Sequence, residues 1–574
     1  MDRRFLLAML LFIAIIVVPS LIFQRPPPPA VAVDSVTTAP LPESLPPAPA
    51  ESAQAQPVEP TISAPPARDT TVHAASDTVT ARTPLTTYDI NTRGARLTGA
   101  RLSRYRSMAP GDDPGPLELL RTDSDLLGLR LIRERDTLYL DRWTFDAPSA
   151  ETALDVAQTA ELSLATAGQG IALDLRYVFR PDDYQIEVSG HFDGIGPNGA
   201  LLLVGLGPGL RNTEADSTGN YRDMGLVTKS VKTSQTRLSS LTPGETKTES
   251  GPFEWTAVKS KYFVAAMFAF DSGAAPISGV TATAPADAGK HPKTADMWAS
   301  VPIAPDGLFR YRVYVGPMEY SRLAAVGHDF DDVNPYGWPG IRTLIRPVAI
   351  GVRWLLVWMH QNLHMTYGLV LVVFGVLVRV ILWPLNQKGM RASLRMQAIQ
   401  PLMKEIQEKY KGEPQRLQQE VFKLYKEHNV NPLGGCWPVL LPMPVLFALF
   451  FVFLNTIELR GVPFLWLPDL SRADPLYIIP VLMGLSMWAM SKVGQIGVPP
   501  NPQMKMMLYI MPLMMTVLFV RFPSGLNLYY TVSNMVSIPQ QWYLAKERLG
   551  AKPGGAHPPT ERASKKTGKA KPRK

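Results

Sequence analysis

The chain of 574 residues has little of three things, and each shortage excludes a class of protein. Because Cys436 is its single cysteine, the chain is not a disulfide-stabilised scaffold. Charged residues make up only 19%, against about 25% in ordinary soluble domains. The second half has no paired carboxylates, no Ser, His and Asp set and no CxxC motif. We therefore predict neither an enzyme nor a bound cofactor or metal.

Two motifs in the first half resemble ligand sites but have simpler explanations. The segment GIGPNG at residues 194–199 fits the dinucleotide-binding pattern GxGxxG. That pattern requires a helix to follow, whereas the strand-like residues 201–204 come next. The segment HDFDD at residues 328–332 offers metal-ligand types, but no second group of ligands is visible in the sequence. We interpret it as an acidic loop at the end of a domain.

The N-terminal region divides into an apolar segment and a long polar one. Residues 5–23 are an uncharged apolar run behind two arginines, long enough to cross about 30 Å of hydrocarbon. We predict an uncleaved transmembrane anchor over residues 1–23. A cleaved signal peptide, with residues 30–32 as its cleavage site, is the alternative. Residues 24–84 are rich in Pro, Ala, Ser and Thr, which predicts a semi-extended linker.

Residues 85–332 show the two-residue period of β-strands. In residues 171–179, Ile, Leu, Leu, Tyr and Phe stand at every second position. Residues 184–192 and 309–315 repeat the alternation, with Gly, Pro and Asp clusters between the runs. The pattern predicts an all-β domain, an antiparallel sandwich that is large enough to bury its own core. A change of composition after Pro335 makes this domain separable from the second half of the chain.

The second half is predicted to be a helical membrane bundle. Over residues 336–360, apolar side chains recur at helical spacing while three arginines lie on another face, which predicts an amphipathic helix in the membrane interface. Five apolar segments follow, and with the N-terminal anchor they make six spans. Their predicted bounds are residues 364–385, 437–455, 475–491, 504–522 and 524–542. Residues 386–431 between the first two are predicted to form a helical hairpin, broken at Gly412 and restarted at Pro414.

The distribution of Lys and Arg sets the predicted orientation. The hairpin segment carries nine Lys and Arg, and the tail, residues 543–574, carries ten against two Glu. Six spans and a cytoplasmic N-terminus place both basic segments in the cytoplasm and the β domain on the other side of the membrane. If residues 336–360 crossed the membrane instead, the nine charges of the hairpin would lie outside, against the positive-inside rule.

Arg379 is the most informative residue of the predicted bundle. Trp383 is expected to mark the membrane interface, which puts Arg379 one helical turn deeper, or roughly 6 Å. No acidic residue lies in residues 5–23 or in the other five predicted spans to neutralise it. Either the guanidinium snorkels to the cytoplasmic surface, or it faces a hydrated cavity inside the bundle where it attracts an anionic group.

Polar residues recur along one side of the last predicted span. The stripe consists of Asn527, Tyr530, Thr531, Asn534 and Gln541, and it is widened by Ser533, Ser537 and Gln540. Hydrogen bonds between helices would explain it, and so would the lining of a cavity. Both interpretations stay open at the level of the sequence.

Several long motifs in this half carry a family resemblance. They are VR at residues 378–379, WPLNQKGM at 383–390, NPLGGC at 431–436 and PSGLNLYY at 523–530. In this order they resemble the YidC-type membrane protein insertases, closely over residues 336–541. A shorter likeness lies at KYF, residues 261–263. The N-terminal anchor and the large β domain resemble the Gram-negative form, in which that domain is periplasmic and the bundle lies in the inner membrane.

The resemblance implies a function and a set of partners. Such insertases pass hydrophobic segments of nascent proteins into the bilayer, alone or beside the Sec translocon. It implies a groove with Arg379, Tyr529 and Tyr530 in its wall. If the polar stripe lines a cavity, Asn527, Thr531 and Asn534 belong to the same groove. A groove Gln of the family is Pro442 here, a nearby Tyr is Phe450 and a frequent Thr is Gly375, which predicts a less polar groove. The basic tail and the hairpin are expected to contact the ribosome.

Two other classes of function remain as alternatives. A transporter of small solutes or anions could use Arg379 as its binding site, but neither an inverted repeat nor a second intramembrane charge is evident in the sequence. A membrane-tethered domain that binds or modifies carbohydrate would need a group of carboxylates in a cleft of the β domain, which a sequence does not reveal.

Overall fold

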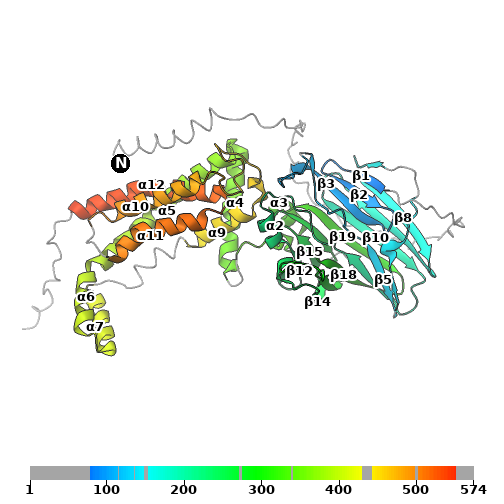
Figure 1. Ribbon diagram of the computed structural model, residues 1–574, viewed down its shortest axis with the longest axis horizontal. Helices are drawn as coiled ribbons and strands as arrows, with labels where there is room; N and C mark the ends of the chain where they lie inside the picture. The colour runs from blue at the N-terminus through cyan, green and yellow to red at the C-terminus, as the bar shows by residue number, and fades with distance from the viewer. Residues whose placement is uncertain are drawn as a thin grey trace, which may run out of the picture.

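The computed structural model describes residues 78–113, 115–134, 136–147, 153–269, 275–337, 341–428, 443–497 and 502–550. The predicted anchor, most of the predicted linker and most of the basic tail lie outside these ranges. Figure 1 shows a domain of β-sheets beside a bundle of helices, with two helices, α6 and α7, at the end of the bundle away from the sheets. The bulk of the chain therefore forms the two parts that the sequence predicts.

The β domain contains three sheets. The five-stranded sheet has the order β4 (Pro116–Glu118), β3 (Arg96–Arg106), β2 (Thr86–Asn91), β1 (Thr78–Arg82) and β7 (Ala153–Asp155). The eight-stranded sheet has the order β13 (Thr233–Arg237), β12 (Gly225–Lys229), β15 (Trp255–Lys259), β16 (Phe263–Phe268), β19 (Leu308–Pro317), β10 (Gln185–Asp193), β9 (Ile171–Phe179) and β8 (Ala160–Gly168). The six-stranded sheet has the order β14 (Thr246–Phe253), β17 (Ile277–Thr283), β18 (Asp296–Ile303), β11 (Ala200–Gly205), β5 (Leu129–Arg133) and β6 (Asp136–Leu138).

The strands pair as their two-residue period predicts. Along β9 buried positions alternate with more exposed ones, and Leu173 and Tyr177 are both buried. Neighbouring strands of the three sheets run antiparallel, except β1 and β7, which are parallel. One hydrophobic core takes side chains from all three sheets, among them Ile90, Leu173 and Leu202. The predicted antiparallel sandwich is thus extended by a third sheet.

The start of this domain differs from the sequence prediction. β1 begins at Thr78, inside the predicted linker of residues 24–84. The prediction missed this strand because its buried residues, Val79 and Ala81, resemble the small apolar residues of the linker. The strand expected after the GIGPNG segment is confirmed as β11. In the segment at residues 328–332, the carboxylates pair with cations: Asp329 with Lys229 at 2.9 Å and Asp331 with Arg346 at 2.7 Å.

The centre of the eight-stranded sheet is covered on both faces. All residues of β15 and β16 are buried, with no alternation. On one face Phe268 packs against Phe330 of the 3₁₀ helix η3 (Phe330–Val333), with ring centroids 4.7 Å apart. On the other face Phe263 packs edge-on against Tyr105 at 5.5 Å. β15 and β16 are therefore buried along their whole length, because η3, just before the helical bundle, covers one face of the sheet and Tyr105 covers the other.

The second part consists of helices. They are α4 (Arg342–Leu363), α5 (Tyr367–Ala398), α6 (Gln400–Lys409), α7 (Pro414–Glu427), α9 (Met443–Asn455), α10 (Ile478–Gly494), α11 (Pro502–Phe519) and α12 (Ser524–Gly550). Two of them, α5 and α12, are longer than the predicted apolar segments. α5 continues into the predicted hairpin, and α12 continues eight residues into the predicted tail. Two short helices, α2 (Ser217–Asp223) and α3 (Tyr320–Val326), belong to the β domain.

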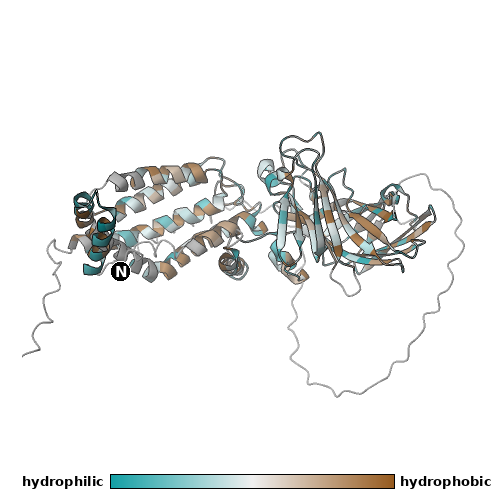
Figure 2. Ribbon diagram, turned by 90° about the horizontal axis from the view of Figure 1, so that it is seen from below, coloured by the Kyte–Doolittle hydropathy of each residue, from teal (hydrophilic) through white to brown (hydrophobic). Residues whose placement is uncertain are grey.

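Within the described residues, one stretch has the length and apolar composition to cross a membrane. It is Tyr367–Pro384 in α5. Three shorter apolar helices accompany it, at Val445–Asn455, Ile478–Gly494 and Leu508–Phe519. Figure 2 shows apolar residues distributed along these helices. The predicted count of six spans is therefore not confirmed, because the later helices are short or, like α12, carry many polar residues.

α4 lies across the end of the bundle that faces the β domain (Figure 1). Trp354 and Trp358 are stacked at 6.4 Å and exposed, as expected for a helix in a membrane interface. Its arginines do not form the free polar face that the sequence predicts. Arg346 pairs with Asp331, and the side chain of Arg353 is buried beside Glu458. The polar face of α4 therefore docks on protein.

The predicted hairpin forms from α6 and α7. The helices are separated by a turn at residues 410–412, and α7 begins at Pro414, as predicted. The Tyr425 hydroxyl donates to Met403 Sδ at 3.4 Å, and Leu424 is buried. The apolar stripe of α7 thus packs on α6, whereas Phe422 on the other side of α7 is 56% exposed.

Candidate functional site

Arg379 lies on α5, where it contacts α12. Its Nε donates to the Ser533 carbonyl at 3.1 Å and to Ser533 Oγ at 2.9 Å. The side chain is partly buried, and within the described residues no carboxylate forms an ion pair with it. A guanidinium has five N–H donors, and the contacts with Ser533 use one of them. Arg379 is therefore held in place through Nε, and its charge is not neutralised by a carboxylate of the described chain.

One face of α12 meets α5 around this arginine. Tyr529 interacts with both Arg379 and Ser533 and is itself buried, against Phe374 of α5 and Phe453 of α9. About two turns beyond Ser533, Gln540 donates to the Trp383 carbonyl at 3.2 Å. Tyr529 and Ser533 are four residues apart, so they share a face of the helix. This face brings the predicted residues Arg379 and Tyr529 together.

The other predicted residues of α12 face different helices. Asn527 donates to the Phe519 carbonyl of α11 at 3.0 Å, and Asn534 donates to Ser486 of α10 at 3.3 Å. Thr531 donates to the Asn527 carbonyl of its own helix at 2.8 Å. Tyr530 packs edge-on against Phe519 at 5.5 Å. For these residues the stripe reflects contacts within and between helices, which was one of the two interpretations left open.

Ser533 has a larger role than its place at the edge of the predicted stripe indicates. It widens the predicted stripe, whereas in the structure it is the hydrogen-bond partner of Arg379. The spacing of four residues between Tyr529 and Ser533 indicates in the sequence that the two share a face of the helix. This spacing does not show which neighbouring helix that face contacts. Ser537 donates to the Ser533 carbonyl at 2.6 Å, so that carbonyl accepts from two side chains.

The departures from the family pattern have a partial structural explanation. A Cβ on Gly375 would lie 3.2 Å from Val532 and 3.5 Å from Tyr529, so a small residue lets α5 approach α12 closely. Phe450 packs against Phe522, which precedes α12, and so it lies toward the β-domain end of the bundle, away from Arg379. Pro442 lies outside the described residues.

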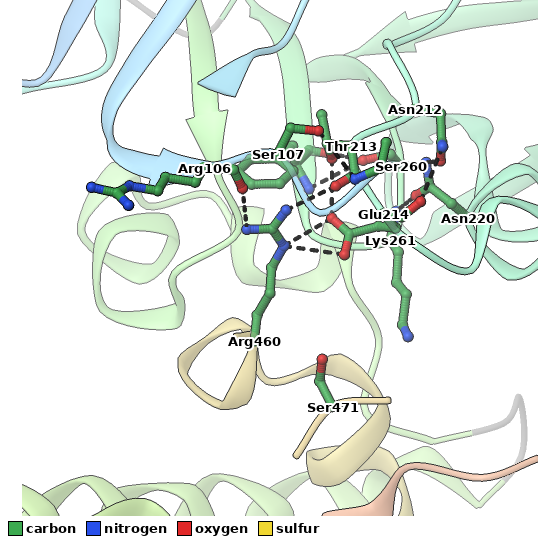
Figure 3. A network of polar contacts seen from close by, with 12 residues as sticks. Arg106, Ser107, Asn212, Thr213, Glu214, Asn220, Ser260, Lys261, Arg460 and Ser471 are labelled. Atoms are coloured by element: carbon green, nitrogen blue, oxygen red, sulfur yellow. Dashed lines mark hydrogen bonds and ion pairs between the residues drawn. The ribbon is translucent and has the colours of Figure 1, made fainter. Parts of the chain in front are cut away.

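A second polar centre joins the bundle to the β domain. Arg460 follows the 3₁₀ helix η5 (Ile457–Leu459), and its Nε donates to both oxygens of Glu214 at 2.8 and 3.1 Å. Its Nη atoms donate to the Arg106 and Thr213 carbonyls at 2.9 and 3.0 Å. Figure 3 shows the guanidinium enclosed by these partners from the β domain. The two side chains are 3% and 9% exposed, so the pair is buried.

Burial controls the electrostatics of this junction. It raises the pKa of Glu214 above its ordinary value, although Arg460 opposes the shift. Ile457 of the same turn is part of the β-domain core. Asn334 donates to the Asn455 carbonyl at 3.3 Å, and Asn455 donates to the Pro335 carbonyl at 3.4 Å. The turn after α9 is therefore packed into the β domain.

Comparisons with known proteins cover both parts of the chain. Residues 78–349 match the family model of the YidC periplasmic domain, and residues 358–551 match that of the 60Kd inner membrane protein. The membrane protein insertase YidC of Chlorobaculum parvum is 31% identical over 502 residues, which is 81% of this chain and 82% of that protein. The chain belongs to the YidC family of membrane protein insertases. The YidC of Syntrophus aciditrophicus is 30% identical over 579 residues, 95% of this chain and 100% of that protein.

Family membership fixes several features in general terms. The β-rich part is the YidC periplasmic domain, and its match begins at Thr78, where β1 begins. The helical part corresponds to an inner membrane protein. The alternative of a solute or anion transporter is not favoured, because the relatives are named as insertases.

Proposed function

We propose that this chain inserts hydrophobic segments of nascent membrane proteins into the inner membrane and helps them fold. The observation that carries the proposal, beside the family, is Arg379: a cation within a membrane-spanning stretch, held by Ser533 and without an ion pair in the described residues. A positive charge in a bilayer is costly, about 2.5–3.5 kcal/mol at a helix centre on insertion scales, so its retention indicates a role.

In the proposed mechanism, Arg379 lies in a hydrated groove that is open to the cytoplasm and to lipid. It attracts the polar or acidic flank of a client, and the surrounding low dielectric strengthens that attraction compared with bulk water. The apolar client segment then moves into lipid, gaining about 0.3–0.6 kcal/mol for each central Leu, Ile, Phe or Val. Partition supplies the driving force, so no nucleotide is required.

The proposed groove is built on the α5-facing side of α12. Tyr529 interacts with Arg379 and Ser533 and supports the guanidinium from within the bundle. Tyr530 is half-buried and can present its ring to a client. The proposed groove also includes Asn527, Thr531 and Asn534. Their hydrogen bonds support a role in fixing α12 against α10 and α11.

The topology and the partners belong to the same proposal. We propose six spans: the anchor at residues 1–23, α5, α9, α10, α11 and α12, with both termini and the α6–α7 hairpin in the cytoplasm. α4 then lies in the outer interface. The proposed partners are the Sec translocon, the ribosome at the hairpin and the basic tail, and the lipid bilayer. The positive-inside distribution of Lys and Arg supports this arrangement.

A charge series at Arg379 tests the mechanism. Arg379→Ala is expected to reduce insertion of a client with an acidic flank about fivefold or more, since it removes an attraction of about 1–4 kcal/mol. Arg379→Lys should retain much of the activity, because lysine keeps the positive charge, although it lacks the planar guanidinium group. Arg379→Glu should be worst, because it repels the flank. The measurement is insertion of one client with either a neutral or an acidic flank, normalised to protein level.

The matched control is Lys492→Ala, which removes an exposed cation at the end of α10. It should insert both clients as the parent does. Equal insertion of the acidic-flank client by Arg379→Ala and the parent would refute the groove charge and leave snorkelling as the explanation.

Deletion of residues 554–574 tests the contact with the ribosome. The deleted segment carries seven Lys and Arg and one Glu, so it is expected to bind RNA phosphates in a salt-dependent way. Ribosome co-sedimentation of the truncated protein should fall at low salt, and the difference from the parent should shrink as salt rises. A tail of the same length with Gln in place of Lys and Arg serves as the control, and it should behave like the deletion. If both proteins co-sediment like the parent at low salt, the tail is not a ribosome contact.

A further inference from the structure

A large cleft lies between the periplasmic domain and the adjoining ends of the membrane helices. Its volume is about 1970 Å³, and side chains from both parts of the molecule line it. α9 ends at this cleft, and the turn between α11 and α12 also borders it. Because these helix ends face the periplasmic domain, the cleft lies at the level of the outer membrane interface.

The charged part of the lining is strongly cationic. Ten Lys and Arg but only five Asp and Glu line the cleft. Several of the carboxylates already have partners: Glu214 pairs with Arg460, and Asp329 pairs with Lys229 at 2.9 Å. An excess of positive charge therefore remains after these pairs are formed.

Lys259, near the end of the domain closest to the helices, is the most unusual of these cations. Its side chain is 5% exposed, and its hydrogen-bond partner is Asn334 Oδ1 at 3.3 Å. Within the described residues no carboxylate lies within 4.0 Å of its ammonium. Burial lowers the pKa of Lys259 to about 8, so it is still mostly protonated at neutral pH. A buried cation whose hydrogen-bond partner is neutral favours the binding of an anion in the cleft, because a buried charge is costly unless it is paired.

Lys261 and Arg472 extend the cationic side toward the helices. Figure 3 shows the Lys261 side chain reaching away from the Glu214 network, on the side where the helices lie. Arg472 is exposed, and its carbonyl accepts from the Ser524 amide at 2.6 Å, which holds it at the start of α12. Neither cation forms an ion pair within the described residues.

The remaining part of the lining is apolar and comes from the membrane helices. Phe450 of α9 and Phe522 before α12 pack with ring centroids 5.7 Å apart, and both line the cleft. Leu518 of α11, 55% exposed, continues this apolar surface. The cleft thus has a cationic side formed mainly by the periplasmic domain and an apolar side formed by the bundle.

We propose that the cleft binds an anionic phospholipid of the outer leaflet, with its phosphate against Lys259, Lys261 and Arg472 and its acyl chains along Phe450, Leu518 and Phe522. A single molecule with an anionic head and apolar tails satisfies both sides of the cleft at once. An acidic peptide would satisfy the cationic side but leave the apolar side without a partner. The site is separate from Arg379 and does not depend on the proposed insertion mechanism.

Lipid titration of the purified full chain in mild detergent tests the site, with native mass spectrometry as the readout. Phosphatidylglycerol is expected to bind at least about tenfold more tightly than phosphatidylcholine, because only the former carries net negative charge against the cations. Lys259→Met combined with Lys261→Gln should reduce this preference about tenfold. Arg472→Gln, at an exposed position, should reduce it independently, so the test stands even if the buried change disturbs folding. Lys290→Gln, an exposed lysine outside the cleft, is the matched control and should keep the preference.

Three results would overturn the proposal. The first is equal binding of phosphatidylglycerol and phosphatidylcholine by the parent. The second is an unchanged preference in both Arg472→Gln and the folded double variant. The third is displacement of phosphatidylglycerol by inorganic phosphate or by an acidic peptide at the same concentration, which would identify a phosphate or peptide site that makes no use of the apolar side.

Discussion

Replacing Arg460 by alanine is expected to destabilise the docking of the periplasmic domain on the bundle by about 3–5 kcal/mol. The change leaves Glu214 buried without its counter-charge, and the Arg106 and Thr213 carbonyls lose their donors. Breaking a buried ion pair by removing one partner costs this much because an uncompensated charge remains inside the protein. Hydrogen exchange at residues 457–461 and 212–214 should therefore become faster by two to three orders of magnitude or more, which is roughly what such a loss implies.

Two controls separate the buried charge from ordinary loss of contacts. Arg460→Met with Glu214→Gln removes both charges and should cost less than Arg460→Ala alone. Arg416→Ala breaks an exposed pair with Glu413, whose side chains are 65% and 57% exposed, and it should change stability by less than about 1 kcal/mol. If Arg460→Ala leaves the exchange rates near those of the parent, the pair does not hold the domains together.

Replacing Lys259 by methionine is expected to raise the free energy of unfolding at pH 7 by roughly 3 kcal/mol. Burial lowers the pKa of Lys259 from 10.5 to about 8, so the folded protein bears the cost of the buried charge below pH 8. As pH rises from 8 to 10.5, the folded protein releases this proton before the unfolded chain does, and the cost disappears. The parent should therefore gain stability relative to Lys259→Met over this window, until the two are similar above about pH 10.5.

Urea unfolding of the full chain in detergent at pH 7 and pH 10 measures this difference. Lys229→Met is the matched control, because Lys229 lies in the neighbouring strand and lines the same cleft but is paired with Asp329. The free energy of unfolding of Lys229→Met should differ from that of the parent by less than about 1 kcal/mol, since Asp329 is 57% exposed and can be hydrated when the lysine is lost. A Lys259→Met protein that is less stable than the parent at pH 7 would show that the lysine is satisfied in the fold.

Local sequence patterns predicted several strands and the α6–α7 hairpin, but not the contacts between distant elements. The alternation in residues 171–179 predicts β9 correctly, because the apolar side chains at its odd-numbered positions are buried in the core. Gly412 and Pro414 mark the hairpin turn, because their backbone preferences act locally. The composition of residues 24–84 concealed β1, since Val79 and Ala81 differ little from the small residues of a linker.

Contacts between distant segments could not be predicted in the same way. Glu214 and Arg460 are 246 positions apart, and neither belongs to a periodic pattern that would connect them. The polar stripe on α12 was visible in the sequence, but its division between Ser533 facing α5 and Asn534 facing α10 depends on how three helices pack around one. The change of composition after Pro335 suggested separable parts, whereas Ile457 shares the core of the β domain.

The turn at residues 457–460 attaches the C-terminal end of α9 firmly to the periplasmic domain. Ile457 is fixed in the core of that domain, Arg460 is fixed by Glu214, and Arg353 of α4 is fixed by Glu458 between them. Because α4 and α9 also pack on each other, we expect both helices to move as one body with the sheets. A displacement of α9 during the passage of a client would tilt the whole domain, so a fluorescent label on β9 would report in the periplasm on an event inside the bilayer.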